Sequence, residues 1–163
     1  MPLTFAYGSN MDAQAMAQRC PRGKLLGRAR LPRHRVGLMP DGYATLVPDA
    51  AAVAHGVLWD VSFAELATLD RYEGVAQGGY VKISQPVLRE VGAPVRALIY
   101  FGKNLGKPGT RLGRAPDDYV EKIVAAAVEA GLPGEHVDFL RRLGGEDIAP
   151  PTRFRAIKNP HFL

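Results

Sequence analysis

A short apolar strand that breaks abruptly into a turn and a helix is the feature that most constrains this chain. Leu3–Tyr7 reads as the strand, Gly8-Ser9-Asn10 as the turn, and a helix is predicted to begin at Met11 or Asp12. The glycine lets another group approach the backbone closely. The turn directs several backbone N–H groups to one side, and the start of a helix favours anions. The stretch therefore predicts a site for a carboxylate or a developing oxyanion, although such a junction is more often only a junction.

The other predicted strands follow from apolar, β-branched runs between Pro- and Gly-containing turns. Pro32 lies inside the first of these runs and marks an edge or a bulge, because proline cannot donate to a strand ladder. The predicted strands are Lys24–Leu38, Tyr43–Val47, Val53–Val61, Tyr80–Glu90 and Val95–Phe101, and the inward-facing candidates of the first are Leu25, Leu26, Leu31, Val36 and Leu38.

Helix boundaries carry clear local signals. Ser62 and Glu65 have the spacing of a capping box, and Gly74 is a suitable C-terminal stop for the helix that they begin. Pro116-Asp117-Asp118 predicts another helix start, because proline suits the first turn and carboxylates favour the positive end of the helix dipole. The predicted helices are Met11–Cys20, Ser62–Tyr72, one that begins at Pro116 and is closed by Gly131-Leu132-Pro133, and Glu135–Leu143.

The predicted strands and helices alternate along only part of the chain, which favours an α+β fold. A chain of 163 residues fits one domain, and it contains no internal repeat or linker. We therefore expect a single domain over residues 1–163, with 146–163 as an extended C-terminal tail. The predicted architecture is a small mixed curved sheet or open barrel of about six strands, flanked by helices.

The formal net charge of +5 raises the question of nucleic-acid binding. A basic cluster lies along one predicted strand, but it contains no aromatic residue on which bases could stack, and no known nucleic-acid-binding motif appears in the sequence. A solvated strand face explains the cluster better, and attraction of acidic metabolites is left open. The cluster comprises Arg22, Lys24, Arg28, Arg30, Arg33 and Arg35.

The compartment is predicted from cysteine usage and from apolar runs. Cys20 is the single cysteine and cannot form an intramolecular disulfide, so it reads as a small buried hydrophobe. No apolar run approaches the ~20 residues needed to cross a membrane, and the N-terminus lacks a signal-peptide pattern. We expect a cytoplasmic protein without a membrane partner.

The usual signatures of metal and nucleophilic sites are missing from the sequence. Ser9 lacks the second glycine of a nucleophile elbow and has no histidine placed to form a triad. The histidines are scattered singly, without the spacing of metal ligands, at positions His34, His55, His136 and His161.

Glu73 is the remaining candidate for chemistry. It follows the helix Ser62–Tyr72, where a carboxylate is unfavourable with the helix dipole and therefore needs another reason to be present. Tyr80, Tyr100 and Tyr119 each stand at the end or start of a predicted element. Taken singly, such tyrosines are more often aromatic residues at the edge of a core.

Together these segments resemble the γ-glutamylcyclotransferase family, within the AIG2-like superfamily of small α+β proteins. The pair Tyr7-Gly8-Ser9-Asn10 and Leu69-Asp70-Arg71-Tyr72-Glu73-Gly74, in this order and at this separation, is specific, whereas either motif alone is not. The supporting segments are Gly56-Val57-Leu58-Trp59, Tyr80-Val81 and Ala115-Pro116-Asp117-Asp118-Tyr119.

The resemblance implies an enzyme that cyclises the glutamyl part of a γ-glutamyl amino acid to 5-oxoproline and releases the amino acid. By the same resemblance, Glu73 is the general acid/base, no cofactor is needed, and the partner is a small γ-glutamyl substrate. A homodimer is left as a possible assembly. The implied substrate-binding residues are Tyr7, Gly8, Ser9, Asn10, Tyr80, Tyr100 and Tyr119.

Several alternatives stay open at this point. The leaving group can be an amine, as in a γ-glutamylamine cyclotransferase or an enzyme that removes a γ-glutamyl protecting group. A catalytically silent module that binds a small molecule is a second alternative, and a nucleic-acid binder is a third. We expect the basic, glycine-rich loop 103–114 to cover the pocket mouth and select the leaving amine.

Overall fold

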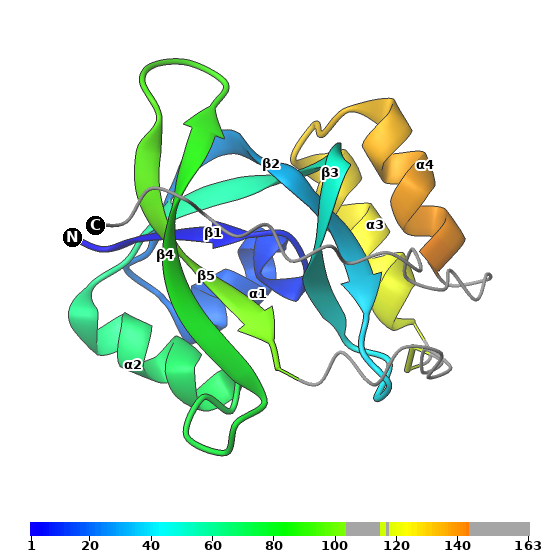
Figure 1. Cartoon of the computed structure of the whole chain (residues 1–163). Helices are drawn as coiled ribbons and strands as arrows, with labels where there is room; N and C mark the ends of the chain where they lie inside the picture. The colour runs from blue at the N-terminus through cyan, green and yellow to red at the C-terminus, as the bar shows by residue number, and fades with distance from the viewer. Residues whose placement is uncertain (104–114, 117, 144–163) are drawn as a thin grey trace, which may run out of the picture.

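A five-stranded barrel forms the centre of this computed structural model, which describes residues 1–103, 115–116 and 118–143 (Figure 1). The strands are β1 (Leu3–Ala6), β2 (Lys24–Leu38), β3 (Ala44–Asp60), β4 (Tyr80–Arg89) and β5 (Val95–Gly102). The helices are the 3-10 turn η1 (Ser9–Met11) and α1 (Ala13–Arg19), α2 (Phe63–Tyr72), α3 (Tyr119–Glu129) and α4 (Gly134–Leu143). Among the described residues, no helix has the length and apolarity required to span a bilayer.

The strand order around the barrel is β1-β3-β2-β4-β5. Neighbouring strands are antiparallel except β1 and β5, which run parallel and meet where Thr4 lies opposite Leu98. The predicted α+β fold with a mixed curved sheet and flanking helices is confirmed. The short contact between β1 and β5 also closes the sheet, so that the barrel keeps no open edge at that seam.

One predicted break in the sheet is wrong. Tyr43–Val47 and Val53–Val61 were expected as two strands, but they belong to the single strand β3. Pro48, between the two predicted strands, lies opposite His34, next to the bulge of β2 at Pro32 and His34. A proline is tolerated at a bulge because the ladder hydrogen bond is interrupted there in any case. The sheet therefore has five strands among the described residues rather than about six.

The bulges of β2 decide which of its leucines face the core. Leu31, Val36 and Leu38 are buried as predicted. Leu25 and Leu26 are 50% and 44% exposed, which contradicts their predicted inward orientation. A second bulge lies between Leu25 and Gly27, with Leu26 as the unpaired residue, and an extra residue in one strand shifts the alternation of side chains between the two faces.

Strands β1 and β3 pack closely because one residue of β3 has no side chain. A Cβ atom on Gly56 would lie 2.1 Å from the carbonyl oxygen of Ala6, so only glycine fits at this position. This contact holds the last residue of β1 against the barrel and sets where the following turn begins.

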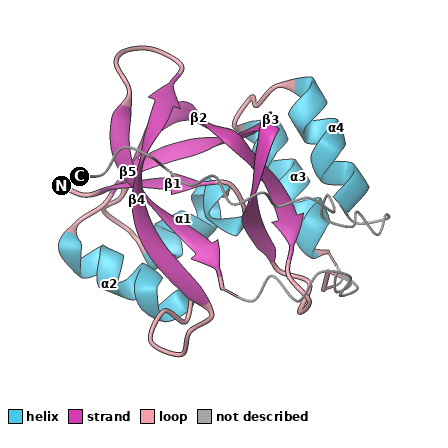
Figure 2. Ribbon diagram, viewed as in Figure 1, coloured by secondary structure: helices cyan, strands magenta, loops and turns pink. Residues whose placement is uncertain are grey.

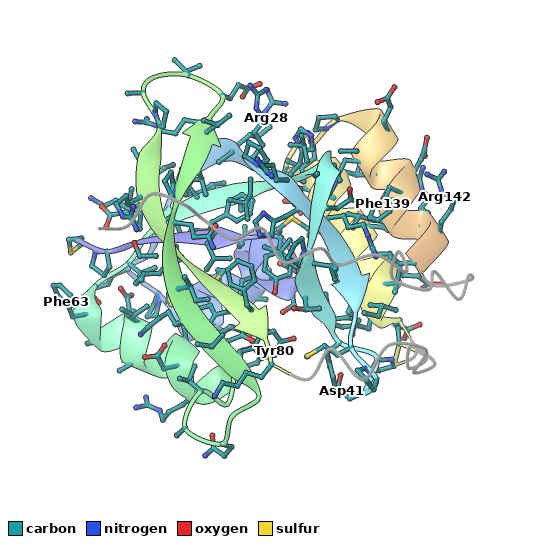
Figure 3. All side chains as sticks on the ribbon, in the orientation of Figure 1. Arg28, Asp41, Phe63, Tyr80, Phe139 and Arg142 are labelled. Atoms are coloured by element: carbon teal, nitrogen blue, oxygen red, sulfur yellow. The ribbon has the colours of Figure 1, made fainter. Side chains whose placement is uncertain are left out.

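Helix α2 lies at one side of the barrel, α3 and α4 lie at the other, and α1 lies between them behind the strands in this view (Figure 2). The predicted capping box of α2 is confirmed, because the Ser62 hydroxyl accepts from the Glu65 N–H while the Glu65 carboxylate accepts from the Ser62 N–H. Leu66 and Leu69 of α2 are buried against the barrel. Phe63, at the start of the same helix, is 76% exposed and points away from it (Figure 3).

Two other predictions at helix ends have different outcomes. Cys20, after α1, is 2% exposed, and burial raises the pKa of its thiol to about 11, so it is the buried hydrophobe that was predicted. Helix α3 begins at Tyr119 rather than at Pro116, because Asp118 has φ +64° and its side chain makes no capping hydrogen bond. Asp117, residues 104–114 of the predicted loop 103–114, Gly144-Gly145 and the predicted tail 146–163 lie outside the described residues.

Candidate active site

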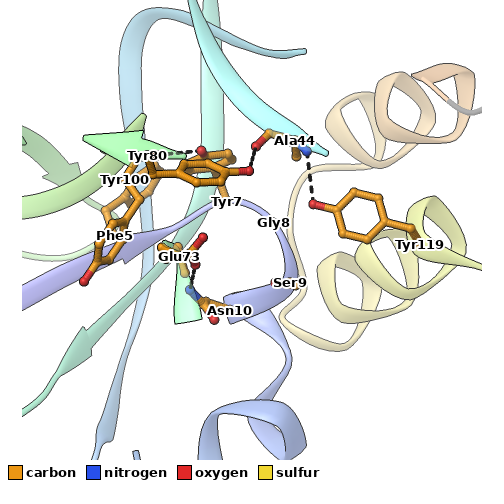
Figure 4. Close-up of a pocket in the computed structure, with 11 residues that line it drawn as sticks. Phe5, Tyr7, Gly8, Ser9, Asn10, Ala44, Glu73, Tyr80, Tyr100 and Tyr119 are labelled. Atoms are coloured by element: carbon orange, nitrogen blue, oxygen red, sulfur yellow. Dashed lines mark hydrogen bonds between the residues drawn. The ribbon is translucent and has the colours of Figure 1, made fainter. Parts of the chain in front are cut away.

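A small cavity of about 40 Å³ lies at the end of β1 (Figure 4). All eight site residues predicted from the sequence line this one cavity, although they come from five different segments of the chain. The lining consists of Phe5, Ala6, Tyr7, Gly8, Ser9, Asn10, Ala44, Glu73, Tyr80, Tyr100 and Tyr119.

The turn after β1 uses its carbonyl groups for its own hydrogen bonds. The Gly8 carbonyl accepts from the Met11 N–H at 2.9 Å, and the Ser9 carbonyl accepts from the Asp12 N–H at 3.3 Å. Among the described residues, the N–H groups of Gly8, Ser9 and Asn10 are not donors in any of the backbone hydrogen bonds found in turns and loops. The indole N–H of Trp59 donates to the Asn10 carbonyl at 3.0 Å and fixes the turn to β3.

Glu73 lies opposite this turn because α2 ends there. Its N–H donates to the Leu69 carbonyl at 2.8 Å, and Gly74 then adopts φ +61°, which reverses the chain. The carboxylate is half-buried and points toward Asn10 (Figure 4). Burial raises the pKa of the Glu73 carboxyl above its ordinary value, and the hydrogen bond from Asn10 and the positive charge of Arg19 oppose this rise.

A chain of hydrogen bonds fixes the orientation of Glu73. The Asn10 side-chain amide donates from Nδ2 to Glu73 Oε1 at 2.8 Å, and Arg19 donates to Asn10 Oδ1. A guanidinium has donors only, so it binds the amide oxygen and turns the amide nitrogen toward the carboxylate. Among the described residues no hydrogen bond engages Glu73 Oε2, which is left to face the cavity.

The four tyrosines of the cavity are held by their hydroxyl groups. Tyr7 donates to the Tyr100 carbonyl at 2.6 Å, and Tyr80 donates to the Ala44 carbonyl at 2.7 Å. The Tyr119 hydroxyl accepts from the Ala44 N–H at 3.1 Å, so the first residue of β3 holds two of the rings (Figure 4).

The phenols cannot serve as bases near neutral pH. Burial is the largest cause that raises the pKa of each, to about 12 for Tyr119 and further for Tyr7, Tyr80 and Tyr100. The four phenols therefore remain protonated, and they offer neutral hydroxyl groups and the faces of their rings to a molecule in the cavity. Glu73 is therefore the cavity residue whose side chain can accept a proton near neutral pH.

Sequence reasoning missed three further residues that support the site. Tyr100 donates its hydroxyl to Asp70 at 2.7 Å, and Lys82 binds the same carboxylate at 2.6 and 2.9 Å. Asp70 and Glu73 are three residues apart at the end of α2, a spacing that places two side chains on one helix face and was available as a signal. Nothing in the local sequence marks Arg19 or Lys82, because their partners are distant in the chain.

The described residues contain no group of three His, Cys, Asp or Glu side chains close enough to hold a metal ion. His161 lies outside them. Of the other histidines, His55 and His136 pack ring against ring with centroids 5.1 Å apart, on the part of the barrel that faces α4.

Comparisons with known proteins identify relatives of this chain. The chain is 28% identical to human gamma-glutamylcyclotransferase over 156 residues, which is 89% of this chain and 80% of the human protein. The chain is 27% identical to bovine gamma-glutamylcyclotransferase over 156 residues, which is again 89% of this chain and 80% of the relative. A solved structure of a gamma-glutamyl cyclotransferase superposes with a TM-score of 0.79, at 25% identity and over 93% of both chains.

The family model that matches describes the AIG2-like family and covers residues 54–140, more than half of the chain. This match includes Glu73, Tyr80, Tyr100 and Tyr119, and the similarity to the human protein covers 89% of this chain. The chain belongs to the AIG2-like family.

Proposed function

We propose that this protein is a γ-glutamylcyclotransferase that cyclises the glutamyl part of a γ-glutamyl substrate to 5-oxoproline without a cofactor. The observation that carries the proposal is the position of Glu73, a half-buried carboxylate with a raised pKa that faces the turn Tyr7–Asn10 across one small cavity. The gamma-glutamylcyclotransferases with which the chain shares 27–28% identity support the same reaction class.

In the proposed reaction the substrate attacks itself. The α-amine of the glutamyl group forms a bond to the γ-carbonyl carbon and closes a five-membered ring, and the bond from that carbon to the leaving nitrogen then breaks. There is no net oxidation, so no electron carrier is required. The residues of the cavity hold the chain in the folded-back conformation, and such intramolecular positioning can contribute ~7–11 kcal/mol to lowering the barrier.

Glu73 moves the proton in this scheme. An α-ammonium group cannot attack a carbonyl, so its proton must first pass to Glu73 Oε2, the carboxylate oxygen not bound by Asn10. Glu73 passes this proton to the departing nitrogen. The ring nitrogen loses a second proton as it becomes an amide, and this proton follows the same route, so that the leaving group departs as an ammonium. A carboxylate with an ordinary pKa of ~4.3 is a weak base, and burial brings its pKa nearer to the working pH.

The backbone N–H groups of the turn Gly8–Asn10 are proposed to stabilise the substrate carbonyl oxygen as it gains negative charge. Donors in such a position typically contribute a few kcal/mol each. Tyr7, Tyr80, Tyr100 and Tyr119 are proposed to enclose the glutamyl chain, because hydrogen bonds to the main chain or to Asp70 already fix their hydroxyl groups.

The test is release of 5-oxoproline from a panel of γ-glutamyl amino acids and γ-glutamylamines. Glu73→Gln is expected to reduce kcat by ~10²–10⁴-fold, because it removes the proton acceptor and keeps an oxygen that can accept from Asn10. Glu129→Gln, at an exposed position of α3, is the matched control and is expected to retain activity. A Glu73→Gln variant with wild-type kcat would remove Glu73 from the mechanism.

Binding of γ-glutamyl compounds without any turnover would instead indicate a catalytically silent binding module. Thermal-shift and calorimetric titrations with the same panel separate this outcome from a protein that does not bind these compounds.

A further inference from the structure

A second carboxylate lies one helical turn before Glu73. Asp70 and Glu73 are three residues apart at the end of α2, a spacing that places their side chains on one side of the helix. The main-chain carbonyl of Asp70 accepts from the Val75 N–H at 3.0 Å, which ties the turn that follows Glu73 back to the helix. The position of Glu73 therefore depends on where Asp70 is held.

Asp70 is held by two side chains from the hairpin of β4 and β5. Lys82 and Tyr100 lie directly opposite each other on these strands, so their side chains lie on the same face of the sheet. Lys82 Nζ binds both carboxylate oxygens of Asp70, at 2.6 and 2.9 Å, and the Tyr100 hydroxyl donates to one of them at 2.7 Å. The Asp70 carboxylate thus fastens the end of α2 to two neighbouring strands.

The same chain of hydrogen bonds reaches the turn after β1. Tyr100 is 5% exposed, and its main-chain carbonyl accepts from the Tyr7 hydroxyl at 2.6 Å. Tyr7 immediately precedes Gly8, where the turn begins whose N–H groups are proposed to stabilise the substrate oxygen. The contacts therefore lead from the helix that ends at Glu73 to the turn that faces it. We call these four residues the Asp70 network: Lys82, Asp70, Tyr100 and Tyr7.

The network depends on the charge of Lys82. The side chains of Lys82 and Asp70 are 23% and 30% exposed, so the pair is only partly solvated. Without the ammonium group, a partly desolvated carboxylate would have no counter-ion, which is unfavourable. The carboxylate would regain water or a proton, and the charge-assisted hydrogen bond from Tyr100 would weaken. Lys82 is not among the residues that line the cavity, so any effect on the reaction must pass through Asp70 and Tyr100.

We propose that Lys82 is a positioning residue, which acts through Asp70 and Tyr100 to fix the separation between Glu73 and the turn after β1. This inference rests on the proposed cyclotransferase function and deepens it by naming a residue outside the cavity on which turnover depends. A misplacement of about 1 Å at a reacting centre can reduce a rate by ~10²-fold. An ion pair that served stability alone would instead change the Tm and leave kcat unaltered.

The experiment measures 5-oxoproline formation by Lys82 variants well below the Tm of each. Lys82→Met is expected to lower kcat by ~10-fold and to change KM by less than ~3-fold, because the groups that line the cavity are all retained. Lys82→Arg keeps the charge and can donate to both oxygens of Asp70, so we expect a kcat within ~3-fold of the wild type. Arg28→Met breaks the exposed ion pair with Glu90, away from the cavity, and is expected to keep the wild-type kcat.

A double-mutant cycle tests whether Lys82 acts through the Tyr100 hydroxyl. Tyr100→Phe removes the hydroxyl that binds Asp70 and keeps the ring. Adding Lys82→Met to Tyr100→Phe is expected to lower kcat by less than ~2-fold further, whereas independent effects would multiply. Tyr100→Phe leaves the ion pair in place, so it carries the test if Lys82→Met does not fold.

A wild-type kcat in folded Lys82→Met or in Tyr100→Phe would overturn the positioning role. Effects that multiply in the double variant, or equal losses of kcat in Lys82→Arg and Lys82→Met, would overturn it too. In each of these outcomes, 5-oxoproline formation by the wild type would still support the proposed function. Absence of 5-oxoproline from the whole γ-glutamyl panel with the wild-type protein would overturn the proposed function and the positioning role with it.

Discussion

At the scale of single residues, burial shifts the pKa values of all the acids of the cavity in the same direction, with different consequences for the carboxylate and the phenols. It raises the pKa of Glu73 and of the four tyrosines alike. The carboxylate becomes a better proton acceptor as a result, whereas the phenols become more firmly neutral. One physical effect therefore separates the proposed base from the groups that surround the substrate.

The raised pKa of Glu73 has a consequence for stability. In the pH interval between the ordinary carboxyl pKa and the raised one, the folded protein binds more protons than the unfolded chain, so the free energy of unfolding decreases as pH rises. We expect Glu73→Gln to raise the Tm at neutral pH and to remove this part of the pH dependence. Thermal denaturation from pH 4 to pH 8 checks it, and a lower Tm for the variant at neutral pH would contradict it.

Arg19 is predicted to position Glu73 through Asn10 rather than to contact the glutamyl group. Arg19→Met removes the donor that orients the Asn10 amide and a positive charge that lowers the pKa of Glu73. We expect kcat to fall by ~10-fold and the acidic limb of the kcat profile to move to higher pH. Arg71→Met, at an exposed position of α2, is the control, and the same profile in both variants would exclude this role.

At the scale of elements, the site depends on how closely the strands pack. The turn after β1, Tyr80 and Tyr119 come together because β1 pairs with β3, and because the first residue of β3 hydrogen-bonds to both tyrosines. The hydrogen bond from Trp59 to the Asn10 carbonyl adds a second tie between β3 and the turn. Strand β3 is therefore the scaffold of the turn and of two tyrosines.

Gly56→Ala tests this packing. The added methyl group would meet the Ala6 carbonyl at 2.1 Å, and a backbone atom in a strand cannot move aside cheaply. We expect a loss of about 3 kcal/mol or more in the free energy of unfolding, measured in urea. Gly134→Ala is the control, because a methyl group there meets no atom within 4 Å. Equal stability of the two variants would show that β1 and β3 can separate without cost.

At the scale of the whole molecule, a pair of histidines with lowered pKa values lies away from the cavity that contains Glu73 and the tyrosines. His55 and His136 pack together where α4 meets the barrel. Burial lowers the pKa of His136 to about 4, helped by the neighbouring His55, whose own pKa is also lowered. His136 Nε2 is buried and has no hydrogen-bond partner among the described residues.

This histidine predicts a sensitivity to acid. Between pH 6.5 and pH 4 the unfolded chain binds a proton that folded His136 does not, so the free energy of unfolding falls as pH falls through this interval. A shift of this size corresponds to roughly 3 kcal/mol. His136→Gln is expected to lose less stability than the wild type over the same interval. Urea titrations at pH 6.5 and pH 4 measure the difference, and equal losses would rule out His136 as the source.

The sequence by itself determined the features that depend on neighbouring residues. The capping box at Ser62, the extent of β2, the hairpin of β4 and β5 and the stop at Gly74 follow from short-range signals, and all are present. The pairing of two motifs also led from the sequence to the family and to a set of residues that line one cavity.

Only the tertiary structure decided the features that depend on distant residues. Asn10 and Glu73 are 63 positions apart, and no local pattern reports that their side chains meet or that Arg19 orients the amide between them. The continuity of β3 through Pro48 likewise depended on the bulge in the partner strand, and the exposure of Leu25 and Leu26 depended on another. Local signals set backbone conformation, whereas burial, strand register and the charges around Glu73 arise only when the barrel brings separate segments together.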